Sequence, residues 1–187
     1  SHLNEKAQLS LDFFDRLIWL KGGRTLEPHR LEELYQRYAG ELYLYAFSLC
    51  QEHAQAQDLM SEAFCRALLS LEGTEDGWRG WLFKVCRNLW LDQLRRRKHL
   101  TGEPPDPDRL AGDGDLLADL IREETRRTVY RAVQDLAPLD REVITLYYYG
   151  ELSLKEVGTA MGISPGAART MLCRARKKLK IRLEGAL

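Results

Sequence analysis

Apolar residues recur every three or four positions along most of this 187-residue chain. This spacing is typical of amphipathic helices, whereas half-buried strands alternate apolar and polar residues. Glycine and proline fall mostly between the periodic segments, where they separate helices. We therefore predict an all-α fold. Its longer helices are expected at residues 31–50, 55–71, 80–98, 119–136 and 139–149.

The C-terminal part of the chain contains the start and stop signals of two further helices. Ser153 can cap the first helix, and Glu156 stands three residues later, as in a capping box. Gly162 can end that helix in the left-handed conformation. Ser164 and Pro165 suit the N-cap and the first position of the next helix. These signals predict a helix-turn-helix.

On 100° steps the second of these helices has two distinct faces. Its apolar face, expected to pack on the first helix, contains Ala168, Met171, Leu172, Ala175 and Leu179. Its polar face contains Arg169, Thr170, Cys173, Arg174, Arg176, Lys177 and Lys180. The small residues Gly166 and Ala167 would let the backbone approach a DNA groove.

The N-terminal part of the second helix of such a motif meets base edges. We therefore expect Arg169, Thr170 and Arg174 to read bases. Phosphate contacts, which carry no direct sequence information, are assigned to Arg176, Lys177, Lys178 and Lys180. The alternative is a basic terminal helix with a solvated face, but the capped preceding helix and the glycine turn favour DNA binding.

A second basic helix is predicted in "WRGWLFKVCRNLWLDQLRRRKH", which contains three of the four tryptophans. One arc is apolar and holds Leu82, Phe83, Val85, Cys86, Leu89, Trp90 and Leu94. The other arc holds Lys84, Arg87, Asn88, Leu91, Arg95 and Lys98. Such a stripe suits DNA with unstacked bases, because cations meet phosphates and aromatic rings stack on bases. We expect Trp90 in the core, whereas Trp78, placed in a loop beside Gly77 and Gly80, could face the core or DNA.

The helix in "AQDLMSEAFCRALLSL" has a mixed acidic and apolar outer arc. This arc contains Asp58, Ser61, Glu62, Cys65 and Leu69. Asp58 and Glu62 are like charges one turn apart, which is unfavourable in an isolated helix. The arc favours a protein partner over DNA, with internal pairing of the carboxylates with arginines as the alternative.

Charge is strongly segregated, although the chain has 28 basic and 28 acidic residues. Residues 72–99 have seven bases and four acids, and residues 153–187 have eight bases and two acids. Between these basic blocks, residues 100–125 have two bases and eight acids. The spacer "TGEPPDPDRLAGDGD" reads as a flexible acidic linker, residues 100–118, between helical domains at 26–99 and 119–187.

Several classes of protein are disfavoured. No apolar run approaches the ~18 to 20 residues that span a bilayer, and the charged N-terminal stretch does not resemble a signal peptide. The cysteines and histidines have no metal-ligand or catalytic-triad spacing, so we expect no metal, no cofactor and no enzymatic activity. Four scattered cysteines are typical of reduced thiols, which predicts a cytoplasmic protein.

The ordered motifs of residues 31–183 resemble those of bacterial RNA polymerase sigma factors of the compact extracytoplasmic-function (ECF) type. The matching segments, in the family's order, are "LYQRYAGELYLYAFSL", "AQDLMSEAFCRALLSL", "WLFKVCRNLWLDQLRRRKH" and "LAPLDREVITLYYYGELSLKEVGTAMGISPGAARTMLCRARKKL". The resemblance implies that 26–99 is the region 2 domain and 119–187 the region 4 domain.

The resemblance also implies partners and roles. The helix with Asp58, Ser61 and Glu62 would bind the clamp helices of the RNA polymerase core. Residues Gly77–Lys98 would recognise and melt the minus-ten promoter element. Positions that match the family's usual pattern there are Arg87, Asn88, Arg95 and Arg96. The helix-turn-helix would read the minus-thirty-five element as duplex beside the polymerase flap, and an anti-sigma factor is a further expected partner.

The chain departs from the family pattern at three positions. Relatives usually have Gln where Ser61 stands, which predicts an altered contact with the polymerase clamp. They more often have Ala at Gly158 and a β-branched residue at Ala168, which predicts looser packing of the two DNA-reading helices. Residues 1–25 lie outside the pattern and could be an extra helix or a regulatory contact. The alternative function is that of a helix-turn-helix repressor or activator that acts on duplex DNA without core polymerase.

Overall fold

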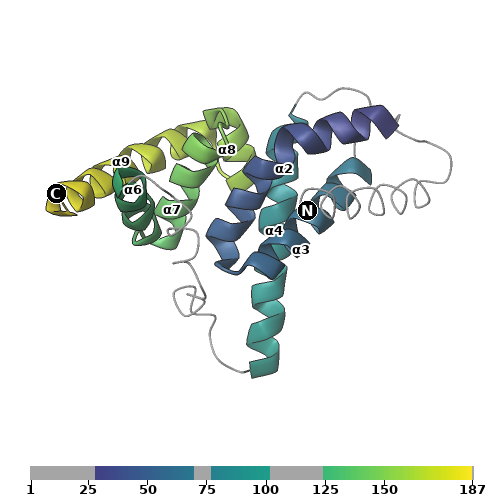
Figure 1. Cartoon of the computed structure of the whole chain (residues 1–187), viewed down its shortest axis with the longest axis horizontal. Coiled ribbons are helices and arrows are strands. Elements are labelled where there is room, and N and C mark those ends of the chain that lie inside the picture. The colour runs from purple at the N-terminus through teal and green to yellow at the C-terminus, as the bar shows by residue number, and fades with distance from the viewer. Residues whose placement is uncertain (1–27, 70–76, 102–123, 187) are drawn as a thin grey trace.

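The computed structural model describes residues 28–69, 77–101 and 124–186 (Figure 1). Within those ranges the chain forms seven α-helices and one π-helical turn, and none of those residues forms a strand. The all-α prediction is therefore confirmed. The N-terminal segment 1–25 and all but the first two residues of the predicted linker 100–118 lie outside the described residues.

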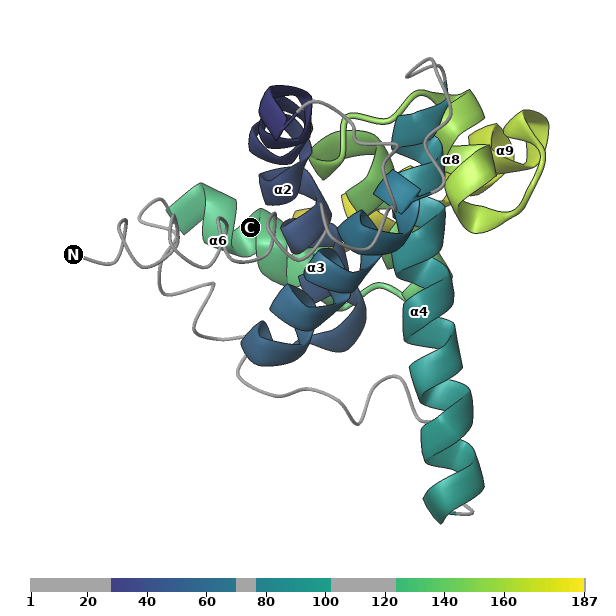
Figure 2. The same cartoon turned by 90° about the vertical axis from the view of Figure 1, so that its right-hand side faces the viewer.

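The N-terminal half consists of three helices that pack against one another: α2 (Pro28–Cys50), α3 (His53–Leu69) and α4 (Trp78–Thr101). Gly77 precedes α4 with a φ of +76°, a left-handed conformation that glycine adopts easily. Trp78 therefore lies in the first turn of a helix, whereas the sequence had predicted that it lies in a loop. The C-terminal half of α4 projects away from the other helices (Figure 2).

The C-terminal half consists of α6 (Glu124–Gln134), α7 (Pro138–Ile144), the π-helical turn η1 (Thr145–Tyr149), α8 (Leu154–Met161) and α9 (Pro165–Ala186). The single helix predicted at 139–149 thus changes its geometry after Ile144. The Gly150 N–H donates to the Thr145 carbonyl, five residues earlier, over 2.9 Å. This widened turn changes the directions of the side chains that follow Ile144.

The two halves share one continuous hydrophobic core. The first half contributes the buried rings of Tyr45, Phe64 and Phe83, among others. The second half contributes Val143, Leu146 and Leu152, among others. The largest contact between the halves joins α4 to α8. The two helical domains that the sequence predicted therefore pack against each other.

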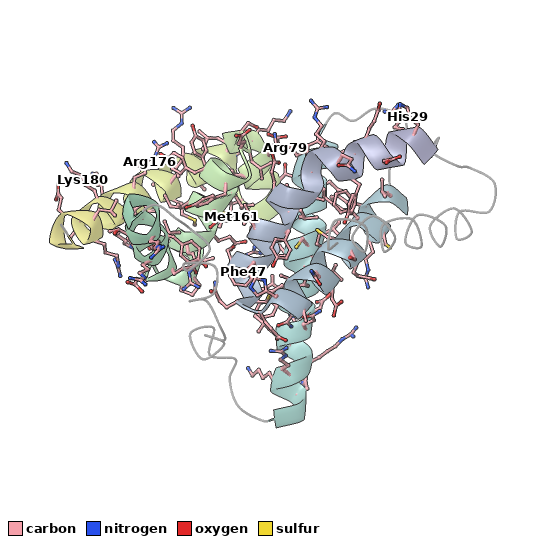
Figure 3. All side chains as sticks on the ribbon, viewed as in Figure 1. His29, Phe47, Arg79, Met161, Arg176 and Lys180 are labelled. Carbon is pink, nitrogen blue, oxygen red and sulfur yellow. The ribbon has the colours of Figure 1, made fainter. Side chains whose placement is uncertain are left out.

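Glycine sets the closest approach between the halves. A Cβ atom added to Gly80 of α4 would lie 3.2 Å from the Glu156 Cα of α8. Larger side chains at Gly80 would therefore separate the two helices. The Arg79 guanidinium, one residue earlier, donates to the Glu41 carboxylate over 3.0 Å and to the Gly150 carbonyl. Figure 3 shows Arg79 close to the junction of the two halves.

Candidate nucleic-acid and polymerase interfaces

The helix-turn-helix forms by the local signals read from the sequence. The Ser153 hydroxyl accepts a hydrogen bond from the Glu156 N–H over 3.3 Å, and the Ser153 N–H donates to the Glu156 carboxylate over 2.8 Å. Gly162 ends α8 with a φ of +70°. The Ser164 hydroxyl then accepts from the Ala167 N–H at the start of α9 over 3.1 Å. The predicted caps and turn are confirmed.

The back of α9 is packed as its helical projection predicted. Ala168, Leu172 and Ala175 are buried, and Met171 and Leu179 are partly buried against the core. This face contacts α7 and α8. A packed back fixes the orientation of α9, so the opposite face points outward in a defined direction.

All nine residues predicted to meet the minus-thirty-five element are exposed on α9. The exposed residues are Gly166, Ala167, Arg169, Thr170, Cys173, Arg174, Arg176, Lys177 and Lys178. The Thr170 hydroxyl donates to the Gly166 carbonyl over 3.1 Å, which leaves its oxygen as an acceptor. With the other described residues, Arg169, Arg174 and Lys177 form no ion pair. Their charges can therefore meet an anionic ligand.

Other cations of α9 have partners on the protein. The Lys178 ammonium lies 2.5 Å from the Asp140 carboxylate of α7, and the Lys180 ammonium lies 3.6 Å from Glu184. The Arg176 guanidinium instead contacts the rings of Tyr147 and Tyr148. The cations of α9 thus form two groups. Carboxylates neutralise Lys178 and Lys180, whereas the other cations named here have no carboxylate partner among the described residues.

Three residues predicted for the minus-ten element are exposed on the projecting helix α4: Asn88, Arg95 and Arg96. Arg95 forms an exposed ion pair with Asp92 over 2.8 Å, and such pairs exchange readily with solvent. Lys84 is half-buried, with its ammonium 5.3 Å from the centre of the Trp81 ring. Trp81 is 40% exposed.

Arg87, also predicted to face DNA, forms an ion pair between the two halves instead. Its Nε donates to Glu142 Oε1 of α7 over 2.7 Å, and the Tyr45 hydroxyl donates to the same oxygen over 2.7 Å. The Glu142 side chain is only 6% exposed and that of Arg87 20%. In this arrangement Arg87 is not open to DNA.

The cluster formed by Tyr45, Arg87 and Glu142 shifts the pKa of two of its members, Arg87 and Tyr45. Burial alone would lower the pKa of Arg87, but the Glu142 carboxylate outweighs that effect and raises it. Burial, and after it the negative charge of Glu142, raises the pKa of Tyr45 well above its usual value. Arg87 therefore stays cationic and Tyr45 stays a neutral donor, which is the pairing that the Glu142 carboxylate needs.

Trp78, one of the predicted minus-ten residues, lies in the core. It is 5% exposed, and its indole N–H donates to the Ala67 carbonyl of α3 over 3.1 Å. Its ring packs beside those of Tyr38 and Phe64. The sequence left open whether Trp78 faces the core or DNA. In the structure it faces the core, because α4 begins at Trp78 and directs that side chain inward.

The outer face of α3 presents the residues predicted to meet the polymerase. Asp58 and Glu62 are exposed, whereas Ser61 and Cys65 are half-buried. Burial, followed by the charge of Glu62, raises the pKa of the Cys65 thiol. Leu69 ends the helix, and its side chain lies outside those described.

Of the two carboxylates on this face, only Glu62 forms an ion pair with another described residue. Glu62 accepts from Arg66 Nε over 2.6 Å, in a pair of which both side chains are at least half exposed. Within the described residues, internal pairing, the alternative considered above, therefore applies to Glu62 but not to Asp58.

Sequence reasoning missed the residues that join the two halves: Tyr45, Arg79, Gly80 and Glu142. The hydrogen bonds that join the halves link residues 55 to 97 positions apart in sequence. The only sequence signal was the oddity of an acidic residue, Glu142, on the apolar face of its helix. A buried charge needs a partner, so this position could have been flagged.

Neither a metal site nor a membrane-spanning helix is found among the described residues. Groups of three or more His, Cys, Asp or Glu residues that could hold a metal ion are absent there. Every helix in those ranges is too short or too polar to cross a membrane.

The fold and the front of α9 define a DNA-binding protein of the helix-turn-helix class. Two family models match the chain: "Sigma-70 region 2" over residues 34–100 and "Sigma-70, region 4" over residues 126–179. The first ends where the predicted linker begins, and the second contains α8, the turn after it and α9 as far as Leu179.

Individual relatives agree with these models. ECF RNA polymerase sigma factor SigM of Bacillus subtilis is 31% identical over 80% of this chain and 93% of its own length. SigE of Mycolicibacterium smegmatis is 29% identical over 80% of this chain and 60% of its own length. The fold resembles that of sigma factor RpoE from Bartonella quintana, solved with the anti-sigma factor NepR. The TM-score is 0.59 at 21% identity, over 82% of this chain and 96% of RpoE. The chain belongs to the ECF family of RNA polymerase sigma factors.

Proposed function

We propose that this chain binds RNA polymerase core and directs promoter-specific initiation, with α9 reading the minus-thirty-five element and α4 recognising and melting the minus-ten element. The observation that carries the proposal is the exposed basic front of α9 on a packed and capped helix-turn-helix. The chain itself is proposed to catalyse no reaction, to need no cofactor and to act in the cytoplasm.

At the minus-thirty-five element, Arg169, Thr170 and Arg174 would meet base edges of the duplex. A bidentate arginine–guanine pair contributes ~1–3 kcal/mol of discrimination. Small modules bind DNA non-specifically with a Kd of ~10⁻⁴ to 10⁻⁶ M at physiological salt. Tethering two modules increases avidity by ~10² to 10⁴ only when their spacing matches the target. A polymerase core would supply that spacing.

At the minus-ten element, exposed Asn88, Arg95 and Arg96 would meet the DNA first. Arg87 is paired with Glu142 in the closed arrangement of the two halves, so its contact with DNA requires the halves to separate. We place this separation at the step where core polymerase binds. Trp81 replaces Trp78 as the ring proposed to stack on a base, because Trp78 is buried.

The proposed contact with the polymerase clamp helices lies on the outer face of α3, around Asp58 and Glu62. The exposed carboxylates of these two residues fit a basic partner surface. The region 4 domain would lie beside the polymerase flap. The similar fold of RpoE was solved with an anti-sigma factor. We extend this class of partner to the present chain as part of the proposal.

The proposal is tested by adding the chain to sigma-free polymerase core with a library of promoter sequences. We expect specific transcripts that appear only when both chain and core are present. Core alone is the matched control. If the chain instead binds one duplex sequence tightly and leaves transcription by core unchanged, it is a conventional helix-turn-helix regulator and the proposal is wrong.

A further inference from the structure

Two consecutive tyrosines hold the side chain of Arg176. The Arg176 Nε donates to the Tyr148 hydroxyl over 2.7 Å. The guanidinium carbon lies 5.2 Å from the centre of the Tyr147 ring and 5.3 Å from that of Tyr148. The two rings meet edge to face at 80°, with their centres 5.1 Å apart. The guanidinium is thus held by two rings and one hydrogen bond.

The π-helical turn η1 explains how two successive residues reach one target. Side chains of neighbouring residues in an α-helix diverge by 100°, and a turn with more residues narrows that angle. Tyr147 and Tyr148 lie in the middle of η1, which is closed by the bond from Gly150 N–H to the Thr145 carbonyl. Such turns occur frequently at functional sites. Here the widened turn directs both rings towards α9.

The partners of Arg176 are neutral, unlike those of its neighbours on the same helix. Lys178 is paired with Asp140 and Lys180 with Glu184, so a carboxylate offsets each of those charges. Arg176 and Lys180 lie one turn apart along α9 (Figure 3). Of the five N–H donors of a guanidinium, the bond to Tyr148 uses one. Arg176 therefore keeps its full charge and four donors while its orientation is fixed.

We propose that Tyr147 and Tyr148 are positioning residues that present Arg176 to a backbone phosphate of duplex DNA. The proposal rests on the proposed reading of duplex by α9. A guanidinium fixed before binding loses less conformational freedom when it meets the phosphate. The exposed position of Arg176 and the 51% exposure of Tyr148 leave room for the DNA backbone at this point.

The free, full chain tests the geometry without DNA. In its nitrogen–proton NMR spectrum we expect a slowly exchanging Nε–H signal from Arg176. Tyr148→Phe removes the hydroxyl and keeps the ring, so this signal should move and exchange faster. Tyr149→Phe removes the neighbouring hydroxyl, which does not contact Arg176, and should leave the signal in place. An Arg176 signal that is unaffected by Tyr148→Phe would overturn the proposed positioning.

Binding to a mixed-sequence duplex of 30 base pairs, measured by fluorescence anisotropy between 50 and 200 mM salt, tests the role. Arg176→Ala should reduce the slope of log K against log salt by about 0.9, the value for one phosphate contact. Tyr148→Phe should weaken binding roughly threefold to tenfold and leave the slope unchanged, because the charge remains. Arg176→Lys should behave like Tyr148→Phe.

A double-mutant cycle separates positioning from a general effect on folding. Tyr148→Phe should have no further effect in the Arg176→Ala background. Equal weakening by Tyr148→Phe in both backgrounds would contradict the positioning role while leaving duplex binding by α9 intact. Absence of duplex binding by the unmodified chain would contradict the duplex contact of α9 on which this proposal rests, whereas the proposed function is decided by the transcription test with core. The NMR comparison would still decide whether the tyrosines orient Arg176.

Discussion

Single glycines determine how closely helices approach in this protein. A Cβ added to Gly158 of α8 would lie 2.7 Å from the Ile163 carbonyl oxygen, whereas a Cβ added to Gly40 of α2 would meet nothing within 4 Å. From the resemblance to the family we had expected looser packing at Gly158. The structure shows the reverse, because the turn closes onto the space that a methyl group would fill.

Gly158→Ala is therefore expected to destabilise the chain. A methyl group forced against backbone costs about 1–3 kcal/mol, which would lower the Tm by several degrees. Gly40→Ala is the control, since an exposed helical glycine replaced by alanine should gain about 0.5–1 kcal/mol. Thermal unfolding measures both. If Gly158→Ala were as stable as the unmodified chain, the tight turn described here would be wrong.

At the scale of elements, the sequence predicts what local signals determine. The caps of α8 and α9 depend on residues within four positions of each other, so Ser153, Glu156, Gly162 and Ser164 were assigned correctly. The packed back of α9 follows from helical periodicity alone. The π-helical turn was missed because apolar periodicity over one five-residue turn does not distinguish it from an α-helix.

The cap of α8 provides a prediction at this scale. Ser153→Ala removes the acceptor for the Glu156 N–H and should destabilise the chain by about 1 kcal/mol. Ser153→Thr keeps a hydroxyl and should retain most of that stability. The free energy of unfolding, measured with denaturant, compares the two variants. Equal losses would show that the side-chain hydroxyl is not the stabilising group.

At the scale of the whole molecule, the ion pair between Arg87 and Glu142 joins the two helical domains that the sequence predicted. Helical projection assigned Arg87 to an outer basic face, and no local pattern indicates that α7 covers that face. Long-range contacts of this kind depend on tertiary packing, which the sequence pattern of each helix does not encode. Of the residues predicted for the minus-ten interface, Asn88, Arg95 and Arg96 are exposed, whereas Arg87 is paired with Glu142 and Trp78 is buried.

Glu142→Gln should loosen the closed arrangement. Breaking a buried ion pair costs about 3 kcal/mol or more because it leaves the partner charge uncompensated. Glu62→Gln breaks a pair of almost the same length, 2.6 Å against 2.7 Å, that is half exposed, and should cost less than ~1 kcal/mol. Small-angle X-ray scattering should show a larger radius of gyration only for Glu142→Gln. Equal radii of gyration for both variants would contradict the claim that Glu142 holds the two halves together.

The proposed polymerase contact is tested by reversing charge on α3. Asp58→Lys with Glu62→Lys should abolish binding to polymerase core and leave binding to duplex DNA unchanged. Glu32→Lys with Glu33→Lys makes the same change of charge on exposed positions of α2 and should bind core normally. Affinity for immobilised core measures the difference. Core binding that survives reversal on α3 would place the clamp contact elsewhere.

The most direct test of the central claim is the map of transcription start sites made by core plus this chain on a randomised promoter library. If core holds α9 and α4 at a set spacing, they should select two sequence elements that lie upstream of each start site and a constant distance apart. Neither element should be selected by core alone. A single selected element, or duplex binding without any core-dependent transcript, would contradict the account.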